Sequence, residues 1–326
     1  MRRTLLIAAA AAVAGLSALI GGSPAQGHPA LSNGQIAFEH YGQIPDESVV
    51  AVVNPDGSGL RTVSPLTPFG RPHWSPDGTR IASVPGGDAP VVASIFNVDT
   101  GSVTTLPNYF SINLGCTVWS PDGARLACSS SFTDGAPDSA GIYTVRASDG
   151  LGITRVTSIP GGEDEPGSYS PNGKRLEFAR FNDDGPVGLF VVNANGTGLK
   201  RITPPGALID GDRFGDWSPQ GNEIVFAQHN NADVRASIWI VHADGSGLHE
   251  IHFDSPIPCG GAFADPNSRG CFDTTWSPDG TKIAFIVNEP NGEGESIYTA
   301  NIDGTDLTQL THGDSEYPDW GTHPTD

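Results

Sequence analysis

Short apolar runs recur in pairs along most of the chain, and polar turn residues separate them. Residues 223–226 and 282–285 are examples of the first run of a pair, and residues 237–241 and 296–300 of the second. Runs of four or five residues rich in Ile, Val, Phe and Tyr, bounded by Gly, Pro, Asn and Asp, are typical of β-strands. The pattern therefore predicts an all-β chain.

A Trp-Ser-Pro-Asp-Gly motif, or a remnant of it, precedes each pair of runs and returns once more near the C-terminus. The six copies start at Trp74, Trp119, Tyr169, Trp217, Trp276 and Trp320, at spacings of 45, 50, 48, 59 and 44 residues. A repeat of this period indicates one supersecondary unit used several times. Ser-Pro-Asp-Gly closes a hairpin, because Pro presets φ and Gly adopts the left-handed conformation. Each unit is therefore expected to be a four-stranded antiparallel sheet.

Radial repetition of such sheets predicts a β-propeller. Residues 35–38 look like a second strand without a first, and residues 317–320 look like the missing first strand. Pairing them would join the two ends of the chain in one blade and remove two exposed sheet edges. We therefore expect a six-bladed propeller, closed by the C-terminal strand joining the N-terminal blade.

These motifs resemble the TolB-type six-bladed propeller family. The likeness lies in the Trp-Ser-Pro-Asp-Gly motifs, the Lys-Ile-Ala-Phe-like strands and the Asn-Ala-Asp-Gly-Ser-like turns, and it covers nearly the whole chain after residue 34. Periplasmic TolB proteins carry an α/β domain ahead of their propeller. Since the first blade here follows the leader directly, we expect a TolB-like propeller lacking that domain. The resemblance implies a protein that binds other proteins outside the cytoplasmic membrane.

The N-terminus has the features of an export signal. Arg2 and Arg3 precede an apolar run over residues 5–20, and a small-residue site ends at Ala25. A membrane anchor is the alternative, but the run is short and rich in Ala and Gly. We expect a signal peptide over 1–25, a short lead-in over 26–34 and a single propeller over 35–326, with no transmembrane segment in the mature chain.

The charge excludes two classes of partner. The chain carries a net charge of −20, and removal of Arg2 and Arg3 with the leader leaves 15 Lys plus Arg against 37 Asp plus Glu, or −22. Such a chain is repelled by nucleic acid and by anionic membranes. We expect a monomer that binds a protein or peptide in the cell envelope or outside the cell.

The four cysteines form two pairs with equal spacing. Cys116 and Cys128 flank one hairpin motif, and Cys259 and Cys271 lie in the longest insertion, each pair 12 residues apart. An even count in an exported chain predicts two local disulfides. A zinc site is the alternative, but neither pair has Cys-x-x-Cys spacing.

Acidic residues are concentrated in the connectors that lead into the innermost strands. With Arg71 and His73, they are expected to ring the mouth of the central channel and to bind a cation such as Ca²⁺ or a basic peptide. On this view, Asp216→Ala with Asp319→Ala would weaken binding and leave the fold intact. The predicted binding residues are Arg71, His73, Glu163, Asp164, Glu165, Asp210, Asp212, Asp216, Asp273, Glu316 and Asp319. A solvating role for these acids is the alternative.

Three functional classes remain open. The favoured one is a non-enzymatic binding protein that uses its long loops and channel mouth. The second is a metal-assisted polysaccharide lyase or hydrolase, because some pectin-degrading enzymes resemble this propeller; of nine histidines, only His73 lies beside a predicted innermost strand. The third is a structural scaffold of the envelope. The fold alone does not separate them.

Overall fold

Each Ser-Pro-Asp-Gly motif forms the hairpin between the first and second strands of a sheet. In the copy after Trp74, the Ser75 hydroxyl donates to Asp77 at 2.6 Å and accepts the Arg80 amide at 3.0 Å. Gly78 has a φ of 67°, which a residue with a Cβ rarely adopts. The turn is therefore held by its own side chains, and it places Trp74 at the end of the innermost strand.

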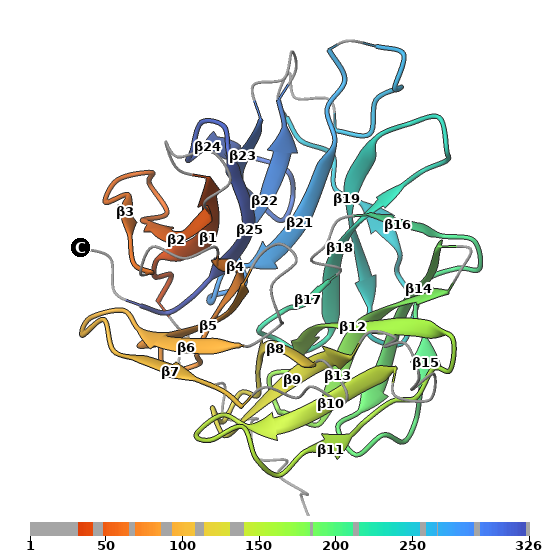
Figure 1. Ribbon diagram of the computed structural model, residues 1–326. Coiled ribbons are helices and arrows are strands. Elements are labelled where there is room, and N and C mark those ends of the chain that lie inside the picture. Colours follow the sequence, from red (N-terminus) through yellow and green to blue (C-terminus); the bar gives the residue numbers. More distant parts are fainter. Residues whose placement is uncertain are drawn as a thin grey trace, which may run out of the picture. The chain divides into compact units, whose positions relative to one another are not determined.

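The structure, a computed structural model, describes residues 32–41, 48–64, 69–85, 93–107, 114–130, 140–182, 185–210, 215–254, 259–265, 267–289 and 294–323. These residues form one compact unit. In it, six antiparallel sheets stand as blades around a common axis (Figure 1). The predicted fold class is confirmed. The predicted export signal lies outside the described residues.

Strands are given from the innermost outward. Blade 1 contains β25 (Ser315–Trp320), β1 (Ile36–Tyr41), β2 (Ser48–Val53) and β3 (Arg61–Thr62). Blade 2 contains β4 (Phe69–Trp74), β5 (Arg80–Pro85), β6 (Ser94–Asn97) and β7 (Val103–Thr105). Blade 3 contains β8 (Leu114–Trp119), β9 (Arg125–Ser130), β10 (Gly141–Arg146) and β11 (Thr154–Arg155).

The remaining blades follow the same order. Blade 4 contains β12 (Gly162–Tyr169), β13 (Arg175–Asn182), β14 (Gly185–Asn193) and β15 (Lys200–Arg201). Blade 5 contains β16 (Leu208–Asp210) and β17 (Asp216–Trp217), which both pair with β18 (Glu223–His229), then β19 (Ala236–His242) and β20 (His249–Glu250). Blade 6 contains β21 (Cys271–Trp276), β22 (Lys282–Asn288), β23 (Glu295–Asn301) and β24 (Thr308–Gln309).

The hydrophobic core lies between the faces of neighbouring blades. One cluster joins Phe38 of blade 1 to Ile297 of blade 6, and another joins Ile142 of blade 3 to Phe178 of blade 4. All four side chains are fully buried. Because each apolar face is covered by the next blade, the core is complete only when the ring is closed.

The ring closes as the sequence predicts. β25 pairs antiparallel with β1, with Ile36 opposite Trp320. Beyond the strands, the Gln35 amide donates to the His323 carbonyl at 2.9 Å, and the Trp320 indole donates to the Gly34 carbonyl at 3.0 Å. The N- and C-terminal segments of the described chain therefore hold each other in blade 1.

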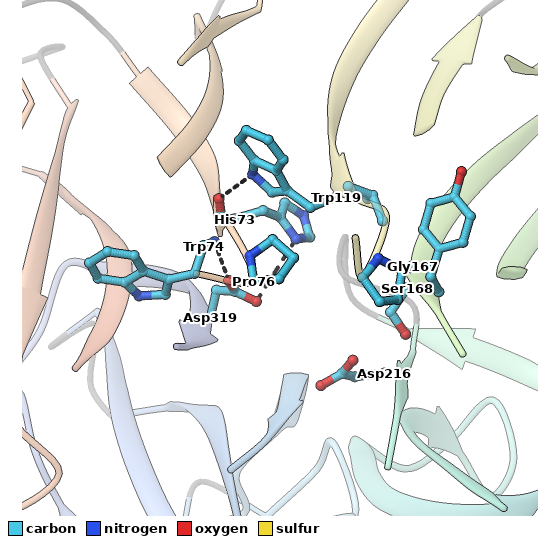
Figure 2. Close-up of a pocket in the computed structure, with 11 residues that line it drawn as sticks. His73, Trp74, Pro76, Trp119, Gly167, Ser168, Asp216 and Asp319 are labelled. Atoms are coloured by element: carbon cyan, nitrogen blue, oxygen red, sulfur yellow. Dashed lines mark hydrogen bonds and ion pairs between the residues drawn. The ribbon is translucent and has the colours of Figure 1, made fainter. Parts of the chain in front are cut away.

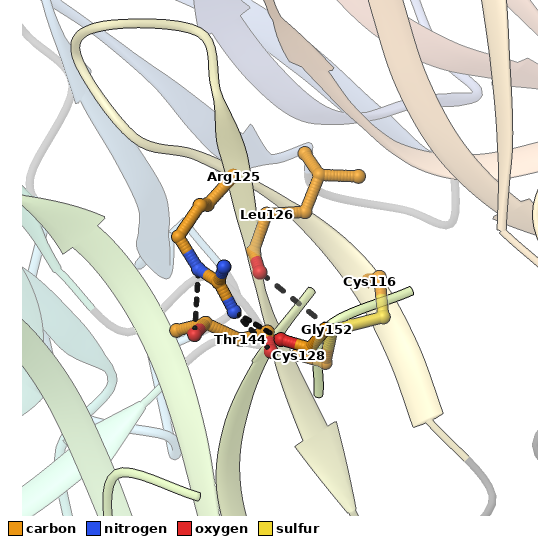
Figure 3. The surroundings of a disulfide bond; sticks show 6 residues. All are labelled: Cys116, Arg125, Leu126, Cys128, Thr144 and Gly152. Carbon is orange, nitrogen blue, oxygen red and sulfur yellow. Dashed lines mark hydrogen bonds between the residues drawn. A yellow bond between two sulfur atoms is a disulfide. The ribbon is translucent and has the colours of Figure 1, made fainter. Parts of the chain in front are cut away.

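Both predicted disulfides are present. Cys116–Cys128 joins directly opposed residues of β8 and β9 (Figure 3). Cys259–Cys271 attaches the insertion after β20 to the start of β21. In the part of the chain described above, no helix is long and apolar enough to span a membrane.

Candidate functional site

In each blade, one residue directly precedes the repeated aromatic residue, which is Tyr169 in blade 4 and Trp in the others. It lies at the end of the innermost strand that adjoins the Ser-Pro-Asp-Gly hairpins, and this end is here called the turn end. Two of these residues are carboxylates that bind the next blade. Asp319 Oδ2 accepts the backbone N–H of Trp74 at 2.6 Å, and Asp216 Oδ2 accepts that of Trp276 at 2.7 Å. The two carboxylates therefore satisfy backbone donors across blade junctions.

Hydroxyl groups do the same at two other junctions. Ser168 Oγ accepts the Trp217 amide at 2.8 Å, and Thr275 Oγ1 accepts the Trp320 amide at 3.4 Å. At the equivalent position of blade 3, Val118 has no acceptor. The junction between blades 3 and 4 therefore cannot form this bond.

These contacts change the expectation for the aspartates, because removing either carboxylate takes away a bond between blades. We expect Asp319→Ala to lower the free energy of unfolding by about 1.5–3 kcal/mol, as for other hydrogen bonds to charged groups. Asp319→Asn keeps an acceptor oxygen and should lose less than half of that. Urea unfolding of the three proteins measures both values. Equal losses in the two variants would show that this bond does not hold the junction.

The predicted acidic residues lie at two levels along the innermost strands. Asp216 and Asp319 are at the turn end, one residue before a Trp. Glu163 and Glu165 are six and four residues before Tyr169, near the opposite end, here called the loop end. At about 3.3 Å per residue, Glu165 is about 10 Å and Glu163 about 16 Å from the turn-end level along a strand. The structure therefore does not gather them into one ring.

Some of the predicted residues have other surroundings. Asp164 is fully buried, accepts from Arg180 at 2.7 and 2.8 Å, and accepts from Thr157 at 2.6 Å, so its carboxylate stabilises blade 4 and its contact with blade 3. Asp273 is buried as well, with 2% of its surface exposed. Asp212 lies outside the described residues.

Three other predicted residues have polar neighbours, two of them at the loop end and one at the turn end. Asp210 lies 3.1 Å from His229 Nε2, and Glu316 accepts the Tyr41 hydroxyl at 3.2 Å. His73, at the turn end, lies 3.8 Å from Asp319. Their roles in binding stay predictions.

Arg71 reaches across the axis at the loop end. It belongs to blade 2, yet its guanidinium lies 3.9 Å from Glu165 of blade 4 and 5.5 Å from the ring centre of Tyr317 of blade 1. Burial raises the pKa of Glu165 to about 8; the charge of Arg71 opposes this rise and that of Glu163 adds to it.

Arg71, Asp273 and Tyr317 have φ values of 50°, 51° and 54°. The left-handed backbone is thus used at equivalent bulges of three blades, each three residues before a Trp.

A cavity of about 200 Å³, here called the central pocket, opens between the innermost strands at the turn end. Its wall combines aromatic and proline rings with two carboxylates, and no Lys or Arg is among the described residues that line it. In Figure 2, Asp319 lies beside Trp74 and Pro76, and Asp216 lies apart from it at the bottom of the view. It is lined by His73, Trp74, Pro76, Val118, Trp119, Pro121, Gly167, Ser168, Tyr169, Asp216 and Asp319.

The predicted calcium site has no preformed ligand set in the described residues, because no three His, Cys, Asp or Glu side chains converge there. Ca²⁺ takes six to eight oxygen ligands, and Asp216 Oδ2 is already bound to the Trp276 amide. His73 is the single histidine of the central pocket. No observation on the described residues therefore favours the metal-assisted lyase.

Sequence reasoning missed the central pocket and the junction acceptors. Both involve the position before the repeated aromatic residue, where the six blades carry five different residue types. Superposing the six copies by their motifs would have shown this variation, since a position required only for the fold should carry similar residues in every blade.

Comparison with known proteins gives consistent results. Residues 33–255 match the family model described as TolB beta propeller domain. The Tol-Pal system protein TolB of Francisella tularensis subsp. mediasiatica (strain FSC147) is 26% identical over 201 residues, which are 61% of this chain and 40% of that protein. The chain therefore spans less than half the length of this curated relative.

Solved structures share the fold. TolB from Acinetobacter baumannii aligns with a TM-score of 0.68 at 19% identity, over 90% of this chain and 67% of that one. The putative TolB from Agrobacterium tumefaciens aligns with a TM-score of 0.64 at 20% identity, over 88% of this chain and 98% of that one.

Proposed function

Because this chain belongs to the TolB β-propeller family, we propose that it is an exported, non-enzymatic binding protein whose central pocket receives a segment of a protein partner. Its curated relatives are named for the Tol-Pal system. A binding role in the cell envelope is carried over from them to this shorter chain as part of the proposal.

The observation that carries the proposal is the composition of the central pocket. Trp74 and Trp119, each 6% exposed, and the partly buried Tyr169 line it with aromatic rings, and Pro76 and Pro121 lie on rigid hairpins. Aromatic side chains on rigid elements provide most of the energy of many protein interfaces. The pocket therefore suits an apolar segment of another protein, held in place by a few polar contacts.

Charge adds to the same argument. Two carboxylates line the pocket, and the whole chain has a net charge of −20. A negative field of this kind attracts positively charged partners and speeds their association. The proposed partner segment therefore carries at least one basic residue beside its apolar ones.

Export is supported by the two disulfides, which persist in oxidising compartments. In this proposal residues 1–25 are a signal peptide cleaved after Ala25. The intact mass of the protein purified from its native envelope or medium would test this, and retention of the first 25 residues would contradict it.

A photo-crosslinking amino acid at Tyr169 tests the binding role directly. Placed in the central pocket, it should give a discrete adduct in an envelope extract that excess unlabelled protein abolishes. The same group at Val103, 44% exposed on the outermost strand β7, is the control. Adducts from Val103 with none from Tyr169 would place any partner on the outer edge and reject the pocket.

A further inference from the structure

Blade 4 departs from the other blades at one inward position of its second strand. The position is the one that lies opposite the residue before the repeated aromatic residue. In blade 4 it holds Glu177, opposite Ser168. In the other five blades the position is small and apolar: Ala37, Ala82, Ala127, Val225 and Ala284. Because all six blades pack in the same way, the fold does not require a glutamate there.

Room for Glu177 is made by glycines in two blades. A Cβ on Gly167 would lie 2.1 Å from Glu177 Oε2, and a Cβ on Gly215 would lie 2.7 Å from Oε1. Both glycines stand two residues before the repeated aromatic residue. The equivalent positions elsewhere hold Pro72, Thr117, Thr274 and Pro318. The glutamate and its two glycines therefore form one coordinated departure from the repeat.

The Glu177 carboxyl group is fully buried, and among the described residues neither of its oxygens has a partner that meets hydrogen-bond geometry. A buried carboxyl group without such a partner is costly, and in a native structure it calls for an explanation. Burial raises the pKa of Glu177 well above its ordinary value, the negative charge of Asp216 raises it further, and the nearby Ser168 amide opposes both. A positively charged hydrogen-bond donor would offset both the burial and the charge of Asp216.

The carboxylate lies directly behind the wall of the central pocket. Gly167, Ser168 and Asp216 form part of that wall (Figure 2), and Glu177 Oε2 lies against Gly167. Because residue 167 has no side chain, the Glu177 carboxyl group reaches the backbone of a pocket-lining residue. Asp216 reaches the same place from blade 5.

We propose that Glu177 and Asp216 together bind the ammonium group of a lysine side chain of the partner segment. This inference rests on the proposed function and specifies its chemistry. The lysine stem would pack on the aromatic and proline rings of the central pocket, while its compact head group donates to two carboxyls on neighbouring blades. The recognised partner is thus one that presents a lysine within an otherwise apolar segment.

The probe is a capped Gly-Gly-Lys-Gly-Gly peptide, with the norleucine analogue as its uncharged counterpart. Binding is followed by NMR of the tryptophan indole N–H groups. We expect the lysine peptide to bind, the norleucine peptide to bind at least tenfold more weakly, and Glu177→Gln to weaken lysine binding by about tenfold. Glu250→Gln, on the outermost strand β20, removes the same charge and should leave binding unchanged.

Three outcomes would overturn the inference. The lysine peptide could bind wild type and Glu177→Gln equally well, or the lysine and norleucine peptides could bind the wild type equally well. In the third outcome, CaCl₂ binds in a way that depends on Glu177 while the lysine peptide does not bind. The geometry has its own test: Gly215→Ala should destabilise the wild type and be tolerated beside Glu177→Ala, because the close contacts of a Cβ on Gly215 are all with the Glu177 carboxyl group. If crosslinking at Tyr169 persists unchanged in Glu177→Gln, the lysine site is rejected while the proposed function stands. If Tyr169 gives no adduct in the wild type, the proposed function itself is rejected.

Discussion

A chain that ends at Asp314 is expected to lose cooperative folding. Such a chain lacks β25, so blade 1 has no innermost strand and β1 becomes an exposed edge. Trp320, which is 6% exposed and packs between blades 1 and 6, is lost as well. Deleting a buried Trp side chain alone costs about 3–5 kcal/mol, a large part of the 5–15 kcal/mol that stabilises a typical domain.

Circular dichroism and urea unfolding would measure this loss. A chain ending at His323 is the control, because it keeps β25 and the bonds of Gln35 and His323. The single variant Trp320→Ala should be intermediate, folded but with a lower unfolding midpoint. If the chain ending at Asp314 unfolds cooperatively at the wild-type midpoint, ring closure by β25 contributes nothing to stability.

We expect the wild-type protein to lose stability as the pH rises above 4.5 because of Glu177, and the Glu177→Gln variant to lack this loss. The folded protein holds Glu177 protonated above the ordinary pKa of 4.5, whereas the unfolded chain releases this proton. Unfolding therefore releases a proton, and rising pH favours the unfolded state by about 1.4 kcal/mol per pH unit, from pH 4.5 up to the raised pKa. The favourable contribution is complete below the unfolded pKa and declines above it.

Urea unfolding at pH values from 4.5 to 8 gives the difference directly. Wild type and Glu177→Gln should be similar in stability at pH 4.5 and diverge steadily as the pH rises, with the variant more stable. Glu250→Gln should follow the wild-type curve. Parallel curves for wild type and Glu177→Gln would mean that this carboxyl ionises in the folded state as easily as in the unfolded one.

The two predictions address different parts of the molecule. The first removes the strand that closes the ring, on which the packing of every blade depends. The second removes a group that a single blade carries and that the fold does not require. If Glu177 lowers stability at neutral pH, its presence is best explained by binding, since a carboxyl kept at a cost is typical of functional sites.

Several features of the fold could be predicted because they depend on neighbouring residues in the chain. The hairpins at the Ser-Pro-Asp-Gly motifs follow from Pro, Asp and Gly in four consecutive positions, and the period of the motif determines the number of blades. Cys116 and Cys128 are paired by the same hairpin. The closing strand followed from a blade that lacks its first strand, which is again a matter of order along the chain.

The candidate site depended on contacts that the order of residues does not reveal. Asp216 and Asp319 bind amides of blades about 60 and 245 residues away, and Asp164, expected at the channel mouth, is buried against Arg180. The sequence by itself determined the blades, their turns and their closure, because local hydrogen bonds and alternating apolar positions specify strands. Only the tertiary structure decided which acids are bound, buried or unpaired, because solvation and partners depend on how distant blades pack around the axis.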